Sequence, residues 1–398
     1  MTNSFSFQSS IMYEQEFQGD VLYMMLYAVV AVLNLVASCY LLFRRGNAIA
    51  PDITSPIRLR RWTGVFFTAM TLSHLWYMPS IYLTSSEDKM MCYDIGGMLD
   101  CMTTFPLAIV ILITMLQDRR RPLWLAFVMV IPLVVILALN LGTHDEAFLP
   151  MFHAYLLLLA IGLTIYMIHE VRRYGCWLRD NYADLEHKEV WQSFVVLAVM
   201  LLGFGIYSFE IGGLANKYIV QVNNIILICY LLWRVESLSD LSISQQQSIS
   251  TGLSVSSSCN NIGPLLQMHC IDTQLYLQHD LSLIQLAKAI GTNRTYLSLY
   301  FSNQNITYNA YINNLRINHF IRLYRKAVAD QHFFTAQQLA LESGYHSYRT
   351  FSEVFKRQTG QSVTVWMKTA NKQEQSQTYL DSAERKLASP ESKTENEG

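Results

Sequence analysis

The sequence predicts an all-α fold in two parts: a polytopic seven-helix membrane bundle, followed by a smaller all-α domain with two helix-turn-helix motifs joined by a long helix. Two observations support this division. Hydrophobic residues make up 52% of the chain and charged residues only 15%, and the apolar excess lies almost entirely before residue 237. Beyond residue 280, one pattern of about twenty residues occurs twice.

The first part contains seven apolar stretches, each near the roughly 20 residues that a helix needs to cross a bilayer. They lie at about 21–43, 62–83, 95–116, 123–141, 148–168, 191–211 and 218–236. We favour membrane spans over the buried helices of a large soluble core, because these stretches are apolar on all faces and are separated by short charged loops. We therefore expect a membrane domain at 21–236, preceded by a short segment at 1–20 whose acidic flank does not resemble a cleavable signal peptide.

Basic residues occupy alternate loops of this domain. They are Arg44, Arg45, Arg58, Arg60 and Arg61 after the first stretch, Arg119, Arg120 and Arg121 after the third, and Arg172, Arg173, Arg179 and Lys188 after the fifth. The other loops hold only Lys89 or Lys217, with several carboxylates beside them. The positive-inside rule then places the N-terminus outside and the C-terminus in the cytoplasm.

Several polar side chains interrupt the apolar stretches. They are His74, near the middle of the second stretch, and Asp100, Asn140, His153, Glu210, Asn223 and Asn224, toward the outer ends of theirs. Polar groups at such depth usually face the bundle interior or a water-filled cavity, so these residues could form a signal pocket open to the outside. They could equally serve as hydrogen bonds between helices, and the sequence leaves both interpretations open.

The repeated pattern has the features of a helix-turn-helix. The copies read LIQLAKAIGTNRTYLSLYF from Leu283 and AQQLALESGYHSYRTFSEVF from Ala336. A small residue must sit where the first helix touches the second, and a glycine must turn the chain between them. Ala287 and Gly291 fill these places in the first copy, and equivalents follow 53 residues later. The inward-facing residues of the second helix, Leu297 and Phe301, recur 54 residues later as Phe351 and Phe355. This offset predicts that the turn of the second motif is one residue longer than that of the first.

Between the copies runs YNAYINNLRINHFIRLYRKAV, which has the periodicity of an amphipathic helix. The apolar positions expected to face inward are Tyr308, Tyr311, Ile312, Leu315, Phe320, Leu323, Tyr324 and Ala327. About 22 helical residues span ~33 Å, close to one turn of B-DNA, so two recognition helices could enter successive major grooves on one face of double-stranded DNA.

Residues 265–370 resemble the DNA-binding domain of the AraC/XylS transcription regulators. The resemblance rests on QLAKAIGTNRTYLSLYF, YINNLRI and ALESGYHSYRTFSEVFKRQTG. It implies two helix-turn-helix motifs joined by one long helix. The chain departs from the family at Asn305, where glycine is usual, and at Val363, where proline is usual. Asparagine tolerates the left-handed conformation, so we expect the turn at Asn305 to survive.

Helix faces and the resemblance together indicate the residues that contact DNA. In the first recognition helix they are Asn293, Arg294, Thr295, Ser298 and Leu299; in the second they are Ser347, Tyr348, Arg349, Ser352 and Glu353, with Lys356 and Arg357 on phosphates. Arg349 is the best candidate for a guanine contact, because the arginine fork matches the major-groove edge of guanine. Residues 265–370 carry ten Lys/Arg against five Asp/Glu, an excess that suits phosphate binding.

The remaining segments carry no recognisable chemistry. Residues 237–264 are rich in Ser and Gln and are expected to form a flexible tether, and residues 371–398 to be a disordered tail. The seven cysteines show no metal-ligand or redox spacing. Phosphate-binding loops and hydrolase motifs are also absent, so we expect no catalytic site, no metal and no cofactor.

These patterns predict a membrane-bound, one-component transcription regulator, which is not an enzyme. We expect a multi-pass protein of a bacterial inner (cytoplasmic) membrane, whose odd number of spans delivers the DNA-binding domain to the cytoplasm. Its expected partners are double-stranded DNA, the lipid bilayer, a small-molecule signal and a second copy of the chain. Two alternatives remain: a transporter or membrane enzyme with an appended helix-turn-helix domain, and a constitutive regulator for which the membrane part is only an anchor.

Overall fold

The computed structural model describes residues 21–44, 46–51, 53–143, 148–196, 198, 213–241 and 262–372. These residues are helical or irregular, and the only β-type pairing among them is an isolated bridge between Tyr182 and Ser282. The chain divides into two compact units. The N-terminal unit comprises Met1–Leu178 and His187–Gly252, and the C-terminal unit comprises Arg179–Glu186 and Leu253–Gly398. The all-α prediction is therefore confirmed.

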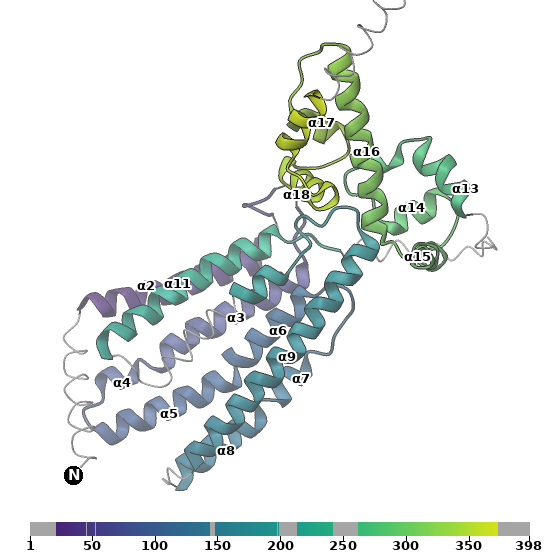
Figure 1. Ribbon diagram of the computed structural model, residues 1–398. Helices are drawn as coiled ribbons and strands as arrows, with labels where there is room; N and C mark the ends of the chain where they lie inside the picture. Colours follow the sequence, from purple (N-terminus) through teal and green to yellow (C-terminus); the bar gives the residue numbers. More distant parts are fainter. Residues whose placement is uncertain are drawn as a thin grey trace, which may run out of the picture. The chain divides into compact units, whose positions relative to one another are not determined.

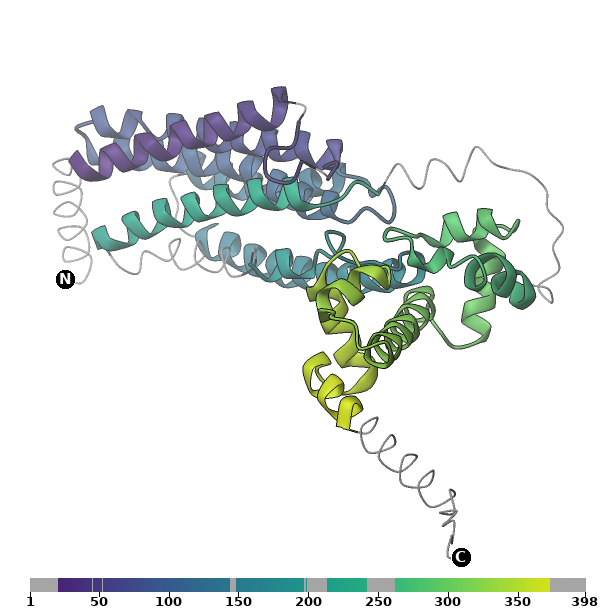
Figure 2. The ribbon, with the colours of Figure 1, turned by 90° about the horizontal axis from the view of Figure 1, so that it is seen from above.

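The N-terminal unit is a bundle of helices. Its elements are α2 (Val21–Phe43), α3 (Ile57–Trp76), α4 (Pro79–Tyr82), α5 (Ser86–Met102), α6 (Thr104–Met115), α7 (Trp124–Val128), α8 (Ile131–Thr143), most of α9 (Leu149–Asn181), and α11 (Gly213–Ser237). Helices α2, α3 and α11 pack against one another, α3 also packs against α6, and α5 packs against α6 and α8 (Figure 1, Figure 2).

Five helical stretches in the described part of this unit are long and apolar enough to cross a membrane. They are Val21–Phe43, Ser86–Met115, Trp124–Thr143, Pro150–Asn181 and Tyr218–Ser237. Each overlaps one of the seven predicted spans. The predicted span at 62–83 corresponds to α3 and α4, and α3 carries three arginines in its first turns. The predicted span at 191–211 lies mostly outside the described residues, so the number seven stays a prediction.

The C-terminal unit contains two helix-turn-helix motifs on either side of one long helix (Figure 1). Its elements are α13 (Ile262–Leu266), η3 (Gln267–Ile271), η4 (Leu275–Leu277), α14 (Leu283–Ala289), α15 (Arg294–Asn303), α16 (Tyr308–Ala329), α17 (Ala336–Glu342) and α18 (Tyr348–Thr359). Helix α16 has 22 residues, as the periodicity predicts. One core surrounds its N-terminal half and a second surrounds its C-terminal half. The predicted tether and tail lie largely outside the described residues.

Local sequence explains why both motifs fold alike. Ser282 with Gln285, and Thr335 with Gln338, form capping boxes that begin α14 and α17, since side chain and backbone satisfy each other's donors. The turn glycine of the second motif, Gly344, has φ +87°, and a Cβ there would lie 2.7 Å from the backbone of Leu277. The equivalent Gly291 has φ +73°.

The left-handed turn predicted at the end of the first motif is also present. Asn305 has φ +51°, a conformation that asparagine adopts more readily than most residues. Gly360 has the same role after α18, with φ +75°. The prediction that asparagine replaces glycine without loss of the turn is confirmed.

The inward face of α16 is more polar than its apolar periodicity predicts. Tyr308, Ile312, Phe320 and Tyr324 are buried as expected, but Asn309, Asn313 and Arg316 are buried with them. Periodicity counts apolar positions only, so it could not reveal buried polar groups that are paired with backbone from distant segments.

Arg316 holds three parts of this unit together. Its guanidinium donates hydrogen bonds to the carbonyl oxygens of Tyr276 (2.7 Å), Gln278 (2.6 Å) and His279 (3.1 Å). It also lies 5.6 Å from the ring centroid of Tyr345, which belongs to the second motif. Burial lowers the pKa of Arg316 from its usual value, but an arginine remains protonated at neutral pH.

We expect Arg316→Ala to destabilise the C-terminal unit by about 3 kcal/mol, because each buried carbonyl left without a donor costs about 1–3 kcal/mol. Arg325→Ala, an exposed arginine on the same helix, is the matched control and should change stability by less than about 0.5 kcal/mol. Pulse proteolysis of the full chain in lipid nanodiscs at increasing urea measures both. Equal urea midpoints for the two variants would contradict this role.

Candidate functional site

The second helix of each motif presents an exposed face. On α15, the predicted contact residues are all exposed: Asn293, Arg294, Thr295, Ser298 and Leu299. Leu297 and Phe301 point inward and are buried, as predicted. Asn293 caps the helix, and its side-chain oxygen accepts a hydrogen bond from the Tyr296 amide at 2.9 Å. The capping role fixes the Asn293 side chain at the N-terminus of α15.

On α18, the predicted contact residues differ in exposure. Arg349, Glu353, Lys356 and Arg357 are exposed, whereas Ser347, Tyr348 and Ser352 are half-buried. The Arg349 guanidinium lies 3.3 Å from the Glu353 carboxylate, with both side chains at least 70% exposed. Such an exposed pair contributes little stability, so Arg349 is available to a ligand. The Tyr348 ring packs beside Phe351, which gives it a structural role as well.

Two of the predicted contact residues already bind another part of the C-terminal unit. The Arg294 side chain donates to the side-chain oxygen of Asn181 at 2.8 Å. The hydroxyl of Ser347, which caps α18, donates to the Glu186 carboxylate at 2.7 Å, and Thr350 donates to the same oxygen at 2.5 Å. Asn181 and Glu186 belong to the loop after the fifth apolar stretch, and sequence reasoning did not connect them with this site.

One signal in the sequence could have indicated this loop. Asp180, Asp184 and Glu186 lie close together in a loop that otherwise follows the arginine-rich pattern of the cytoplasmic side. An acidic cluster at that position suggests a basic partner, but the sequence does not say which one.

The two helix-turn-helix motifs seen in the structure are also recognised by comparison with known families. Residues 286–369 match a family model for a helix-turn-helix domain. The match begins within α14 and ends beyond α18, so it includes α16 and the second motif in full. It supports an AraC-type regulator that binds DNA, and it covers the C-terminal unit only. No curated protein and no solved structure matches the chain.

The polar residues of the N-terminal unit fall into separate hydrogen-bond groups. His74 is buried, with Nδ1 2.7 Å from the Met70 carbonyl, Nε2 3.4 Å from the Gln221 side-chain oxygen, and the Tyr27 ring beside it. Asp100 instead accepts hydrogen bonds from Tyr77 (2.9 Å) and Thr104 (3.3 Å).

The other predicted pocket residues are less closely connected. Asn140, Asn223 and Asn224 each bury one amide atom that has no hydrogen-bond partner among the described residues. His153 is exposed, and Glu210 lies outside the described residues. A shared pocket for these side chains therefore stays a prediction, although the unpartnered amide atoms offer hydrogen-bonding capacity that a polar ligand or water could use.

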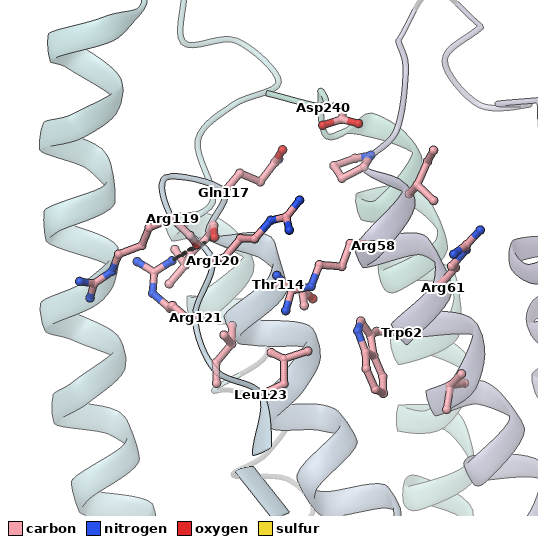
Figure 3. A pocket seen from close by; sticks show the side chains of 15 residues that line it. Arg58, Arg61, Trp62, Thr114, Gln117, Arg119, Arg120, Arg121, Leu123 and Asp240 are labelled. Carbon is pink, nitrogen blue, oxygen red and sulfur yellow. Dashed lines mark hydrogen bonds between the residues drawn. The ribbon is translucent and has the colours of Figure 1, made fainter. Parts of the chain in front are cut away.

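A basic pocket of about 630 Å³ lies between α3 and the loop that follows α6. Figure 3 shows the arginines arrayed around it: Arg58 and Arg61 from α3, and Arg119, Arg120 and Arg121 from the loop. Glu170 pairs with Arg119 at 2.9 Å and with Arg121 at 2.6 Å. Among the described residues, Arg58, Arg61 and Arg120 have no carboxylate partner. Together with Trp62, they can hold an anionic group such as a phosphate.

Proposed function

We propose that this chain is a membrane-bound transcription regulator that reads a specific DNA sequence with α15 and α18. The observation that carries the proposal is the pair of recognition helices, each capped by a side chain (Asn293 or Ser347), in the two motifs that α16 joins. The 22 residues of α16 span ~33 Å at 1.5 Å each. That length suits two adjacent major-groove segments. Phosphate contacts from Lys356 and Arg357 would add affinity that is independent of sequence.

The N-terminal unit would lie in a bacterial inner membrane, with the N-terminus outside and the C-terminal unit in the cytoplasm. Its apolar helices support this, since they leave much of their surface uncovered by protein. In the apolar window of α9 only 6% of residues are buried, and Leu157, Leu158 and Ile165 are each more than 60% exposed. Such surfaces suit lipid and would promote aggregation in water.

We further propose that the membrane unit senses a signal rather than only anchoring the DNA-binding domain. One span would suffice for an anchor, whereas this unit has five helical stretches that are long and apolar enough to be spans, and it buries polar groups at His74 and Asn224. A small molecule or a proton would act on such groups. A second copy of the chain would form a homodimer whose assembly the signal regulates. The signal would act through its different affinity for two states of the bundle.

The direct test of DNA reading uses operators mapped genome-wide with the tagged full-length protein. Arg349→Ala should relax base preference at one operator position, at a cost of ~1–3 kcal/mol in discrimination. Lys356→Ala should weaken all duplexes alike and lower the slope of log affinity against log salt by ~1, because it removes one phosphate contact. Fluorescence anisotropy with operator and scrambled duplexes separates the two effects. Equal affinity for both duplexes in the parent protein would exclude sequence-specific reading.

Reporter fusions test the orientation. A fusion after Lys188 or Ser258 should be cytoplasmic, and one after Asp88 or Asp145 should be outside, because arginines are retained on the cytoplasmic side. Paired alkaline phosphatase and fluorescent-protein reporters give opposite signals at each site. A reversed pattern would place the recognition helices away from DNA and refute the proposal.

A chimera tests sensing. One unrelated membrane span replaces residues 1–236, and transcription of the target is compared with that from the intact chain across growth conditions. We expect the chimera to lose the response, and Asp100→Asn, His153→Ala or Glu210→Gln to alter it. A tenfold change in output requires ~1.4 kcal/mol of preference for one state. If the chimera responds like the intact chain and the substitutions are silent, the membrane unit is only an anchor.

A further inference from the structure

The segment Arg179–Glu186 packs on the C-terminal unit although it lies far from that unit in sequence. Tyr182 forms a β-bridge with Ser282, the cap of α14, and the Ala183 amide donates to the Leu281 carbonyl at 3.3 Å. Ala183 is only 3% exposed and belongs to the core around the first motif. This burial and backbone pairing make the segment an integrated part of the unit.

Two buried amides of α16 hold the backbone of this segment. Asn309 donates to the carbonyl oxygens of Tyr182 (3.2 Å) and Ala183 (2.7 Å), and Asn313 donates to Ala183 at 3.3 Å. Both asparagines are at most 5% exposed. A buried amide without a partner is costly, so these side chains form a site that fits an extended backbone.

The two ends of the segment contact the two recognition helices. Asn181 binds Arg294, the first residue of α15, and Glu186 binds Ser347 and Thr350 in the first turn of α18. The N-terminal end of a recognition helix is the end that enters the major groove. A helix N-terminus is also where phosphate oxygens bind, because it presents unpaired N–H groups and a positive dipole end. The Glu186 carboxylate therefore occupies a position suited to a DNA phosphate.

We propose that the 179–186 segment is an autoinhibitory strap that competes with DNA for the N-terminal ends of α15 and α18. The segment contains three carboxylates, Asp180, Asp184 and Glu186, and one basic residue, Arg179. This acidic character matches the charge of the ligand that the strap would displace. The inference rests on the proposed DNA-reading function and adds the means by which that function is regulated.

The strap is also continuous with a helix of the membrane unit. Asn181 is both the last residue of α9 and the partner of Arg294. A shift of α9 along or about its axis would move Asn181 directly, since a helix transmits displacement along its length. The strap therefore provides a covalent route from the membrane unit to the recognition helices that does not pass through residues 237–264.

Operator affinity of the full chain in lipid nanodiscs tests the strap. Glu186→Ala and Asn181→Ala should each raise operator affinity, by up to roughly tenfold, because apparent affinity scales with the fraction of molecules whose site is open. Glu189→Ala removes the same charge three residues away and lacks contacts with Ser347 and Thr350, so it should leave affinity unchanged. Equal affinities for Glu186→Ala and Glu189→Ala would overturn the proposal.

Hydrogen exchange of the unaltered chain gives a second readout that requires no substitution. The Ala183 amide should be protected without DNA and should exchange faster when operator DNA is saturating. Protection that persists in the DNA complex would overturn the proposal and identify the segment as a permanent part of the fold. If operator and scrambled duplexes bind alike in every variant, the proposed function fails and the strap inference fails with it.

Discussion

The buried guanidinium of Arg316 is the interaction on which the C-terminal unit depends. A charge with 1% exposure is tolerated only when its donors are paired, and here the backbone carbonyls of Tyr276, Gln278 and His279 provide that pairing. Because the same side chain lies over Tyr345, it fixes the segment before the first motif and the turn of the second motif to one point on α16. The relative placement of the recognition helices follows from that one helix.

The polar interior of α16 explains how one helix serves several partners. Its apolar residues contribute to two separate cores. Its buried polar residues Asn309, Asn313 and Arg316 instead donate hydrogen bonds to backbone carbonyls of distant segments. Apolar contacts are non-directional, whereas these hydrogen bonds accept only a backbone in the correct register. The helix thus connects the two helix-turn-helix motifs and also holds the 179–186 segment.

Arginines of the N-terminal unit occur in two different surroundings. Arg60 is paired with Glu236 at 2.8 Å, and Glu236 is fully buried at the end of α11. This pair joins α3 to α11, close to the end of the last apolar helix. Arg58, Arg61 and Arg120 instead line a pocket that Asp240 also lines, and among the described residues none of the three forms an ion pair. A count of arginines in loops predicts orientation, but it does not distinguish a structural ion pair from a basic surface.

The sequence by itself determined the all-α class, the two motifs and the length of α16. These features depend on local signals: apolar periodicity, capping residues such as Ser282 and Thr335, and turn residues such as Gly344 and Asn305. The inward sides of α15 and α18 also followed, since Leu297 and Phe351 define them. On α18, however, Ser347, Tyr348 and Ser352 were predicted to face outward and are half-buried. Only five of the seven predicted spans meet the length and composition of a membrane helix within the described residues.

Only the tertiary structure decided which polar groups are buried and which distant segments meet. Arg316 and Asn309 fit the surface of an isolated amphipathic helix equally well, and their burial follows from backbone carbonyls supplied by residues 276–279 and 182–183. Nothing local marks Glu186 as a partner of Ser347, because the two lie 161 residues apart. Local patterns specify helices and their faces, whereas a hydrogen bond between distant residues depends on how the whole chain packs.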